Sequence, residues 1–270
     1  METIGFVGSG NMAEALIKGI ISAGVYESAN VLVSDVRTER LDYLARQYSV
    51  TIVQENAELA VKADTVVLSV KPQVMAEALE SIREAVTSNK LVISIAAGVK
   101  IERIAGILGD MAIVRVMPNT PALIGEGASA LYANEQARGM VDKVRSIFAS
   151  VGKVVVVDDD EDLIDAVTAV SGSGPAYYFL LMEQMIAAGV ELGLAPDIAK
   201  DLVLQTAKGA AMLAIEADGK GESPAELRRK VTSPGGTTEA ALKVFAEHQM
   251  PEAIVAGIIR ARDRGRELSQ

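Results

Sequence analysis

Short apolar, β-branched runs alternate with amphipathic stretches in the first part of the chain. The runs expected to form strands are Thr3–Val7, Asn30–Ser34, Thr65–Val70, Leu91–Ile95, Ala112–Met117 and Val154–Val157. Helical patterns follow the first two of them, at Asn11–Ala23 and Thr38–Tyr48. This alternation predicts parallel βαβ units with right-handed crossovers, and the nearly continuous apolar strands indicate a sheet that is covered on both faces.

Beyond Val157 and a short acidic run, the pattern is almost entirely helical. The expected helices are Asp162–Val170, Gly174–Leu192, Pro196–Ala217, Pro224–Val231, Thr237–Glu247 and Pro251–Leu268. A short acidic run at residues 158–162 separates the two patterns, and we interpret it as a solvated linker whose carboxylates favour the next helix N-terminus. The sequence therefore predicts an α/β fold with an N-terminal Rossmann-like, doubly wound domain over residues 1–157 and an all-helical domain over residues 158–270.

The expected helices of the second half carry more apolar surface than a domain of this size can bury. Tyr177–Val190 and Leu202–Ile215 are apolar around much of their circumference. Because a helix of that kind has to be covered, we expect the helical domain to associate with a second copy of the chain.

Charge and composition exclude several classes of function. The net charge is −10, cysteine is absent, and His248 is the single histidine. This charge repels nucleic acid and anionic lipid, and the residue inventory excludes disulfides and both thiolate and multi-histidine metal sites. The N-terminus shows no secretion signal, and the most apolar stretch, Pro175–Val190, contains Glu183 and is interpreted as a buried helix. We expect a cytoplasmic protein without a metal, nucleic-acid or membrane partner.

A nucleotide-binding signal follows the first predicted strand, in the segment Gly8-Ser9-Gly10-Asn11-Met12-Ala13. The spacing fits G-x-G-x-x-A, in which the first glycine makes the tight turn, the second lets the backbone approach a pyrophosphate, and the alanine permits close packing of helix on strand. The N-terminus of the following helix offers N–H groups to the phosphates. A tight turn without a ligand is the alternative interpretation.

The end of the second predicted strand leaves the choice of dinucleotide open. Asp35 can accept from a ribose 2′-hydroxyl, which favours NADH, or it can simply cap the following helix. Arg37 and Arg40 are close in sequence and could instead pair with the 2′-phosphate of NADPH.

Further segments follow later strands or break the helices. Val70-Lys71-Pro72 and Ala96-Ala97-Gly98 fall at the carboxyl ends of strands, where doubly wound sheets bind ligands, although Lys71 could equally be a surface residue. In the loop after Met117, two prolines hold Asn119 rigidly. The elbow Ser171–Tyr177 lies between two helices.

The loop Thr232-Ser233-Pro234-Gly235-Gly236-Thr237-Thr238 precedes a predicted helix. Successive small residues before a helix form a nest of N–H donors that suits a carboxylate. Thr237 or Thr238 can cap the helix and also present a hydroxyl. Capping alone does not require two glycines and a proline.

In this order, these segments resemble the pyrroline-5-carboxylate reductase family over essentially the whole chain. The Met-Pro-Asn-Thr-Pro loop, the Ser-Gly-Ser-Gly-Pro-Ala elbow and the Thr-Ser-Pro-Gly-Gly-Thr-Thr loop are quite specific to it. The resemblance implies NADPH- or NADH-dependent hydride transfer to the C=N bond of 1-pyrroline-5-carboxylate, giving L-proline in the last step of proline biosynthesis. Asp35 departs from the Ser, Asn or Arg of many relatives and puts the usual NADPH preference in doubt.

The resemblance also implies roles for individual residues. The residues expected around the cofactor are Gly8, Ser9, Gly10, Asn11 and Met12 at the pyrophosphate, Asp35 and Arg37 at the ribose, Asn56 near the adenosine, and Val70, Lys71, Pro72 and Ala97 toward the nicotinamide. The residues expected around the substrate are Met117, Pro118 and Asn119 beside the nicotinamide and Ser233, Gly235, Gly236 and Thr237 at the carboxylate. Thr238, the candidate catalytic residue, would hydrogen-bond the ring nitrogen.

The implied assembly is a homodimer with interlocking helical domains, which can extend to a larger ring such as a decamer. In such dimers the substrate loop of one subunit meets the nucleotide domain of the other.

Three alternatives compete with this interpretation. A β-hydroxyacid dehydrogenase shares the layout but uses a helix lysine as its acid and base, and the segment Gly172–Glu191 contains no lysine. A nucleotide sensor would have no use for the loop at Thr232–Thr238. A reductase of another cyclic imine, such as the six-membered homologue, would have the same motifs, because the sequence does not show the size of the substrate pocket.

Overall fold

The computed structural model describes residues 2–158 and 160–268. It divides into two compact units, Met1–Pro175 with Ala261–Gln270, and Ala176–Arg260. The expected boundary at Val157 marks the change from strand to helix, whereas the compact units divide after Pro175. The domain limits 1–157 and 158–270 stay a prediction.

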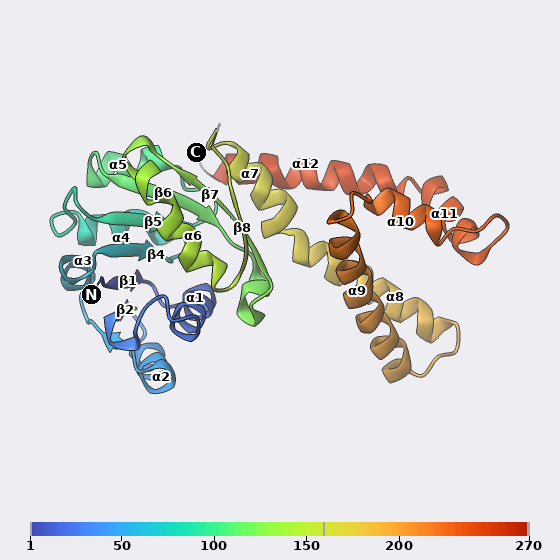
Figure 1. Ribbon diagram of the computed structural model, residues 1–270, viewed down its shortest axis with the longest axis horizontal. Coiled ribbons are helices and arrows are strands. Elements are labelled where there is room, and N and C mark those ends of the chain that lie inside the picture. Colours follow the sequence, from blue (N-terminus) through green and yellow to red (C-terminus); the bar gives the residue numbers. More distant parts are fainter. Residues whose placement is uncertain (1, 159, 269–270) are drawn as a thin grey trace. The chain divides into compact units, whose positions relative to one another are not determined.

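The first unit is built on an eight-stranded sheet of order β3-β2-β1-β4-β5-β6-β7-β8 (Figure 1). The strands are β1 Ile4–Val7, β2 Val31–Ser34, β3 Thr51–Ile52, β4 Thr65–Leu68, β5 Leu91–Ser94, β6 Ala112–Met117, β7 Gly127–Ala133 and β8 Gly152–Val156. Neighbouring strands are parallel except β6 and β7, which pair antiparallel. The predicted α/β, doubly wound fold is confirmed.

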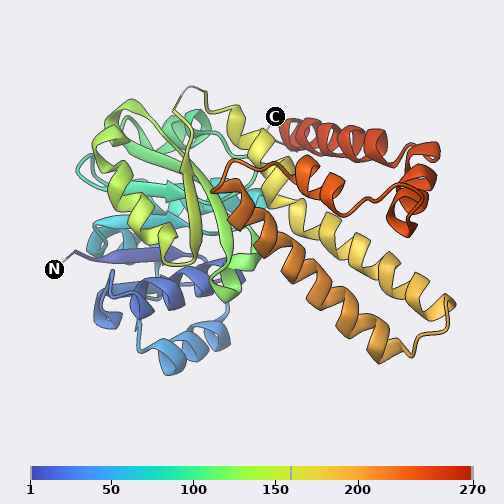
Figure 2. The same ribbon diagram turned by 45° about the vertical axis from the view of Figure 1, so that its right-hand side comes forward.

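Helices cover both faces of this sheet (Figures 1 and 2). They are α1 Asn11–Ser22, α2 Thr38–Tyr48, α3 Asn56–Lys62, α4 Met75–Ile82, α5 Ile101–Leu108, α6 Val141–Ala149 and α7 Leu163–Val167. Alternate strand residues point to opposite faces. Ile4 and Phe6 of β1 therefore join one apolar core with α1, α2 and α6, and Val7 joins the other with α3, α4 and α5.

Two strands were not expected from the sequence. β3 has only two residues. β7 consists mainly of glycine, alanine and serine, which have low strand propensity. It forms because β6 and β8 pair with it on either side. At the second pairing, a Cβ on Gly152 (φ +147) would lie 2.0 Å from the carbonyl oxygen of Gly127, so this approach requires glycine.

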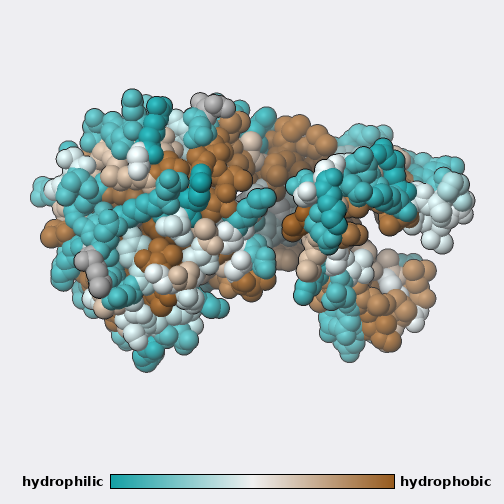
Figure 3. All heavy atoms as spheres, in the orientation of Figure 1, coloured by the Kyte–Doolittle hydropathy of each residue, from teal (hydrophilic) through white to brown (hydrophobic). Residues whose placement is uncertain are grey.

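The second unit is helical, as predicted. Its helices, one of which begins and one of which ends in the first unit, are α8 Gly174–Glu191, α9 Pro196–Asp218, α10 Pro224–Lys230, α11 Thr237–Glu247 and α12 Met250–Leu268. Ser223 and Glu226 form a capping box at the start of α10. Many apolar side chains of α8 and α9 are exposed, for example Phe179 (61%) and Ile215 (76%), and Figure 3 shows apolar surface over α8. None of the described helices is long and apolar enough to span a membrane.

Candidate functional site

The segments expected to hold a cofactor meet at one edge of the sheet. Val7 is in register with Ser34 on one side and with Leu68 on the other, and Leu68 is in register with Ser94. The loops that follow these strand ends therefore leave the sheet side by side. They carry the glycine-rich segment, Asp35, the Val-Lys-Pro segment and the Ala-Ala-Gly segment, as the doubly wound topology predicts.

The two glycines of the first loop have different tasks. Gly8 has φ +86, and a Cβ on it would lie 2.7 Å from Cγ1 of Val70. A Cβ on Gly10 would meet nothing within 4 Å, so the backbone is open on that side. Gly10 is also the N-cap of α1 and provides no side-chain hydrogen bond to it. Free space and a helix N-terminus without a side-chain cap fit the pyrophosphate of a dinucleotide.

Ser9 belongs to the interior of the fold. Its side chain is fully buried, and its hydroxyl donates to the carbonyl oxygen of Ser34 at 3.1 Å. Ser9 therefore uses its hydroxyl inside the fold. Its own N–H is committed as well, because it donates to Oδ2 of Asp35 at 2.8 Å.

Asp35 is surrounded by donors. Besides the N–H of Ser9, its carboxylate accepts the N–H and Nε of Arg37, both at 3.0 Å, and Nη2 of Arg37 at 3.2 Å. Burial raises the pKa of Asp35, but the hydrogen bonds from Arg37 and Ser9 outweigh it and hold the pKa below its usual value. The Arg37 side chain is 59% exposed. The negative charge of Asp35 is thus balanced within the protein.

The other cofactor candidates lie around this edge. Asn56 begins α3. Its side-chain oxygen accepts a hydrogen bond from the hydroxyl of Ser34 at 2.8 Å, and its side-chain nitrogen donates one to the hydroxyl of Ser81 at 3.0 Å. The side chain thus ties α3 to β2. Val70 and Pro72 are partly buried, whereas Lys71 and Ala97 are exposed. Lys71 precedes the short 3-10 helix Pro72–Val74.

The loop after β6 is fixed to two neighbours. Asn119 accepts the N–H of Ala128 at 2.8 Å and donates to the carbonyl oxygen of Ser171 at 3.2 Å. A Cβ on Gly172 would lie 2.4 Å from Cε of Met117. Because the amide of Asn119 is used inside the fold, its role beside a nicotinamide would be to position Met117 and Pro118.

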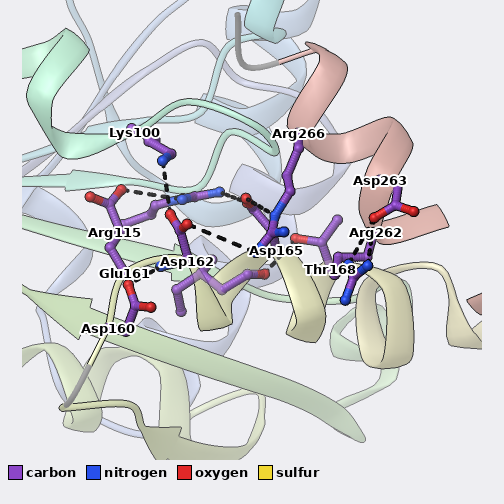
Figure 4. Close-up of polar contacts among 11 residues, drawn as sticks. Lys100, Arg115, Asp160, Glu161, Asp162, Asp165, Thr168, Arg262, Asp263 and Arg266 are labelled. Carbon is purple, nitrogen blue, oxygen red and sulfur yellow. Dashed lines mark hydrogen bonds and ion pairs between the residues drawn. The ribbon is translucent and has the colours of Figure 1, made fainter. Parts of the chain in front are cut away.

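A buried charge cluster on this side of the sheet was missed by sequence reasoning (Figure 4). Arg115 of β6 is 1% exposed, and it pairs with Asp165 of α7 at 2.7 Å and with Glu161 at 3.2 Å. Glu161 also accepts the N–H of Ile101 at 2.9 Å. An arginine inside an apolar strand was the available signal, because a buried guanidinium needs carboxylate partners.

The interpretation of residues 158–162 as a solvated linker was therefore wrong for its last part. Glu161 reaches inward to Arg115, and Asp162 pairs with Lys100 at 2.8 Å. The hydrogen bond from Lys100 lowers the pKa of Asp162. Arg266 in the last turns of α12 approaches Asp162 and Asp165 at 3.8 and 4.0 Å. No group of three or more acidic or histidine side chains in the described part of the chain could hold a metal ion.

In the second unit, the loop between α10 and α11 already holds a carboxylate. The N–H of Gly235, whose φ is +72, donates to Oε2 of Glu239 at 2.7 Å. Gly236 is the N-cap of α11 and no side chain caps it, so the expected capping by Thr237 or Thr238 was wrong. Thr237 is exposed and Thr238 is partly buried. One N–H of the predicted nest thus meets a carboxylate of the chain itself, and sequence reasoning missed Glu239.

Comparisons with known proteins agree with these features. The family model for pyrroline-5-carboxylate reductase dimerisation matches residues 161–268, and the model described as NADP oxidoreductase coenzyme F420-dependent matches residues 3–98. Pyrroline-5-carboxylate reductase of Pseudomonas aeruginosa is 44% identical over 269 residues, covering 99% of this chain and 97% of that protein.

Two solved structures are similar over their whole length. Pyrroline-5-carboxylate reductase from Coxiella burnetii is 39% identical with a TM-score of 0.91, covering 100% of this chain and 99% of that one. Pyrroline carboxylate reductase from Plasmodium falciparum, solved with NADP bound, is 31% identical with a TM-score of 0.88, covering 100% and 98%. With relatives this similar along its entire length, the chain belongs to the pyrroline-5-carboxylate reductase family.

Proposed function

We propose that this chain reduces 1-pyrroline-5-carboxylate to L-proline with NADPH or NADH, the last step of proline biosynthesis. The full-length identity to named pyrroline-5-carboxylate reductases carries the proposal. Two structural features support it: the open glycine-rich loop at the sheet edge and the carboxylate-binding loop before α11.

The residue roles follow the chemistry of each group. When bound, the reduced nicotinamide supplies hydride to the C=N carbon. Backbone N–H groups at the start of α1 hold the pyrophosphate, and Ser233, Gly235, Gly236 and Thr237 hold the substrate carboxylate. Thr238 hydrogen-bonds the ring nitrogen. A cyclic imine can be protonated before it is attacked, so the site needs no strong general acid, which agrees with a chain that lacks cysteine.

The assembly and location extend the same proposal. We infer a cytoplasmic homodimer, which can be built into a larger ring such as a decamer. The dimerisation model matched by the second half and the exposed apolar side chains of α8 and α9 support the dimer.

Substrate binding would change one contact in the loop before α11. Glu239 must release the N–H of Gly235 when the substrate carboxylate takes its place.

Initial rates of NADPH and NADH oxidation at 340 nm test the activity, with 1-pyrroline-5-carboxylate and with its six-membered homologue as alternative substrates. We expect turnover of the five-membered imine. Cofactor binding without turnover of either imine would contradict the proposal. The NADPH to NADH ratio reports whether Arg37 or Asp35 governs the ribose end, and with Asp35 neutralised by Arg37 we expect NADPH to be accepted.

A further inference from the structure

We propose that Arg40 is a positioning residue of the phosphate-binding loop. Its guanidinium holds the peptide groups of Ser9 and Gly10, so that the loop turns its N–H groups toward the pyrophosphate of the cofactor. The inference rests on the proposed function, because it requires a nicotinamide dinucleotide on this loop. It assigns Arg40 a task different from the pairing with a 2′-phosphate that the sequence left open.

The side chain of Arg40 is directed at the loop. Arg40 lies in the first turn of α2, and its side chain is 17% exposed. Its Nε donates to the carbonyl oxygen of Ser9 at 2.6 Å, and its Nη2 donates to that of Gly10 at 3.3 Å. A guanidinium can bind two carbonyl oxygens at once because its donors form a planar fork.

A second layer of contacts holds Arg40 in this position. Nη2 of Arg40 pairs with Oε2 of Glu14 on α1, and Oε1 of Glu14 accepts the hydroxyls of Tyr43 at 3.0 Å and Tyr48 at 2.9 Å. The guanidinium also lies 5.2 Å from the ring centre of Tyr43. Burial raises the pKa of Glu14, but the hydrogen bonds from Arg40 and the two tyrosines outweigh burial and hold the pKa below its usual value. Glu14 therefore stays charged at neutral pH.

Peptide geometry converts these contacts into an orientation of the loop. In a trans peptide the carbonyl and the following N–H point in opposite directions. Because the carbonyls of Ser9 and Gly10 face Arg40, the N–H groups of Gly10 and Asn11 face away from it. A Cβ on Gly10 would meet open space. N–H groups beside open space at a helix N-terminus form an anion site.

The two cofactors separate this role from a direct phosphate contact. NADPH and NADH share the pyrophosphate and differ in the 2′-phosphate. If Arg40 positions the loop, Arg40→Met raises the Kd of both by the same factor, about tenfold for the loss of charge-assisted hydrogen bonds. Arg40→Lys keeps the charge but lacks the fork, and we expect a similar loss. Arg46→Met, at an exposed arginine of the same helix, is the matched control.

The Kd values of NADPH and NADH are measured by titration, using the fluorescence of the reduced nicotinamide. The Kd values of NADP⁺ and NAD⁺ are measured by calorimetry. The Tm of each variant reports whether it is folded. We expect equal losses for both cofactors, a kcat at saturating cofactor within about twofold of the original, and no change in the Arg46 variant. A loss confined to NADPH, full affinity in Arg40→Lys, or unchanged affinity in Arg40→Met would each overturn the inference.

Two further results keep the test decisive. If Arg40→Met does not fold, the test uses Arg40→Lys and Glu14→Gln instead. Glu14→Gln should raise the Kd of both cofactors by the same factor, and by less than Arg40→Lys does, because the contacts between Arg40 and the loop remain. If the unchanged protein binds neither dinucleotide, the proposed function fails. If it binds them and the Arg40 variants bind as tightly, only the role of Arg40 is lost.

Discussion

Thr238 has the hydroxyl that the proposed mechanism places at the ring nitrogen, and it is partly buried at the start of α11. Removing one hydrogen bond of roughly 1.5–3 kcal/mol should lower kcat/KM about ten- to a hundredfold in Thr238→Ala. Steady-state rates with 1-pyrroline-5-carboxylate measure this. Thr87→Ala, the same change on an exposed loop of the first unit, should leave kcat/KM unaltered. Equal rates in both variants would remove Thr238 from the mechanism.

Gly8 and Gly10 should respond differently to the same substitution. Gly8→Ala places a Cβ against Val70 in a left-handed backbone, so we expect a loss of about 1–3 kcal/mol in unfolding free energy together with weak cofactor binding. Gly10→Ala meets open space in the protein and should keep its Tm while losing cofactor affinity. Thermal unfolding and NADPH titration of both variants test this. A Gly10→Ala protein that binds NADPH normally would contradict the placement of the pyrophosphate.

At the scale of elements, the Arg115–Asp165 ion pair joins β6 to α7 (Figure 4). Removing one member of a buried pair leaves an uncompensated charge, so Arg115→Met should cost about 3–5 kcal/mol in unfolding free energy. The double variant Arg115→Met with Asp165→Leu should recover much of that loss, since no buried charge of the pair remains. Urea unfolding of the unsubstituted protein, the two single variants and the double variant completes the double-mutant cycle. Additive losses would show that the two side chains are not coupled.

The contact between α1 and α2 should depend on pH through Glu14. The pKa of Glu14 is lower in the folded protein than its ordinary value, because the hydrogen bonds from Arg40 and the tyrosines outweigh burial. Its contribution to stability is therefore complete above the unfolded pKa of about 4.3 and is lost as the pH falls through the folded pKa. We expect Glu14→Gln to be less stable than the original at pH 7, with the difference shrinking below about pH 5. A constant difference from pH 7 to pH 3 would refute this, and chemical unfolding at each pH measures it.

How far the sequence predicted these elements depended on where each one draws its stability. The apolar strands and the helices with clear periodicity, such as α2 and α11, were predicted with their observed bounds or within a few residues. β7 was missed because its small residues carry no strand signal and its neighbours supply the pairing. Arg115 and the inward turn of Glu161 were missed because the two are 46 residues apart and only the fold brings them together. In the candidate site, the order of the segments was readable, whereas the partners of Asp35, Arg40 and Asn119 were not.

On the scale of the whole molecule, the helical unit exposes more apolar side chain than a soluble monomer normally does. Phe179 on α8 and Ile215 on α9 are 61% and 76% exposed, and large contiguous apolar surfaces of this kind mark interfaces. The dimerisation model that matches residues 161–268 covers these same helices. The exposed faces of α8 and α9 and the dimerisation model thus support the proposed association with a second copy of the chain.

This association predicts the effect of placing a charge on that surface. The unchanged protein should sediment at equilibrium as a dimer or a larger assembly, because burying apolar surface contributes about 25 cal/mol per Å². Phe179→Glu and Ile215→Glu should shift it toward monomer, since an unpaired carboxylate in an interface is costly to desolvate. Gln47→Glu, at an exposed residue of α2, should sediment as the original does. If the unchanged protein is a monomer at micromolar concentration, the apolar faces of α8 and α9 have another function.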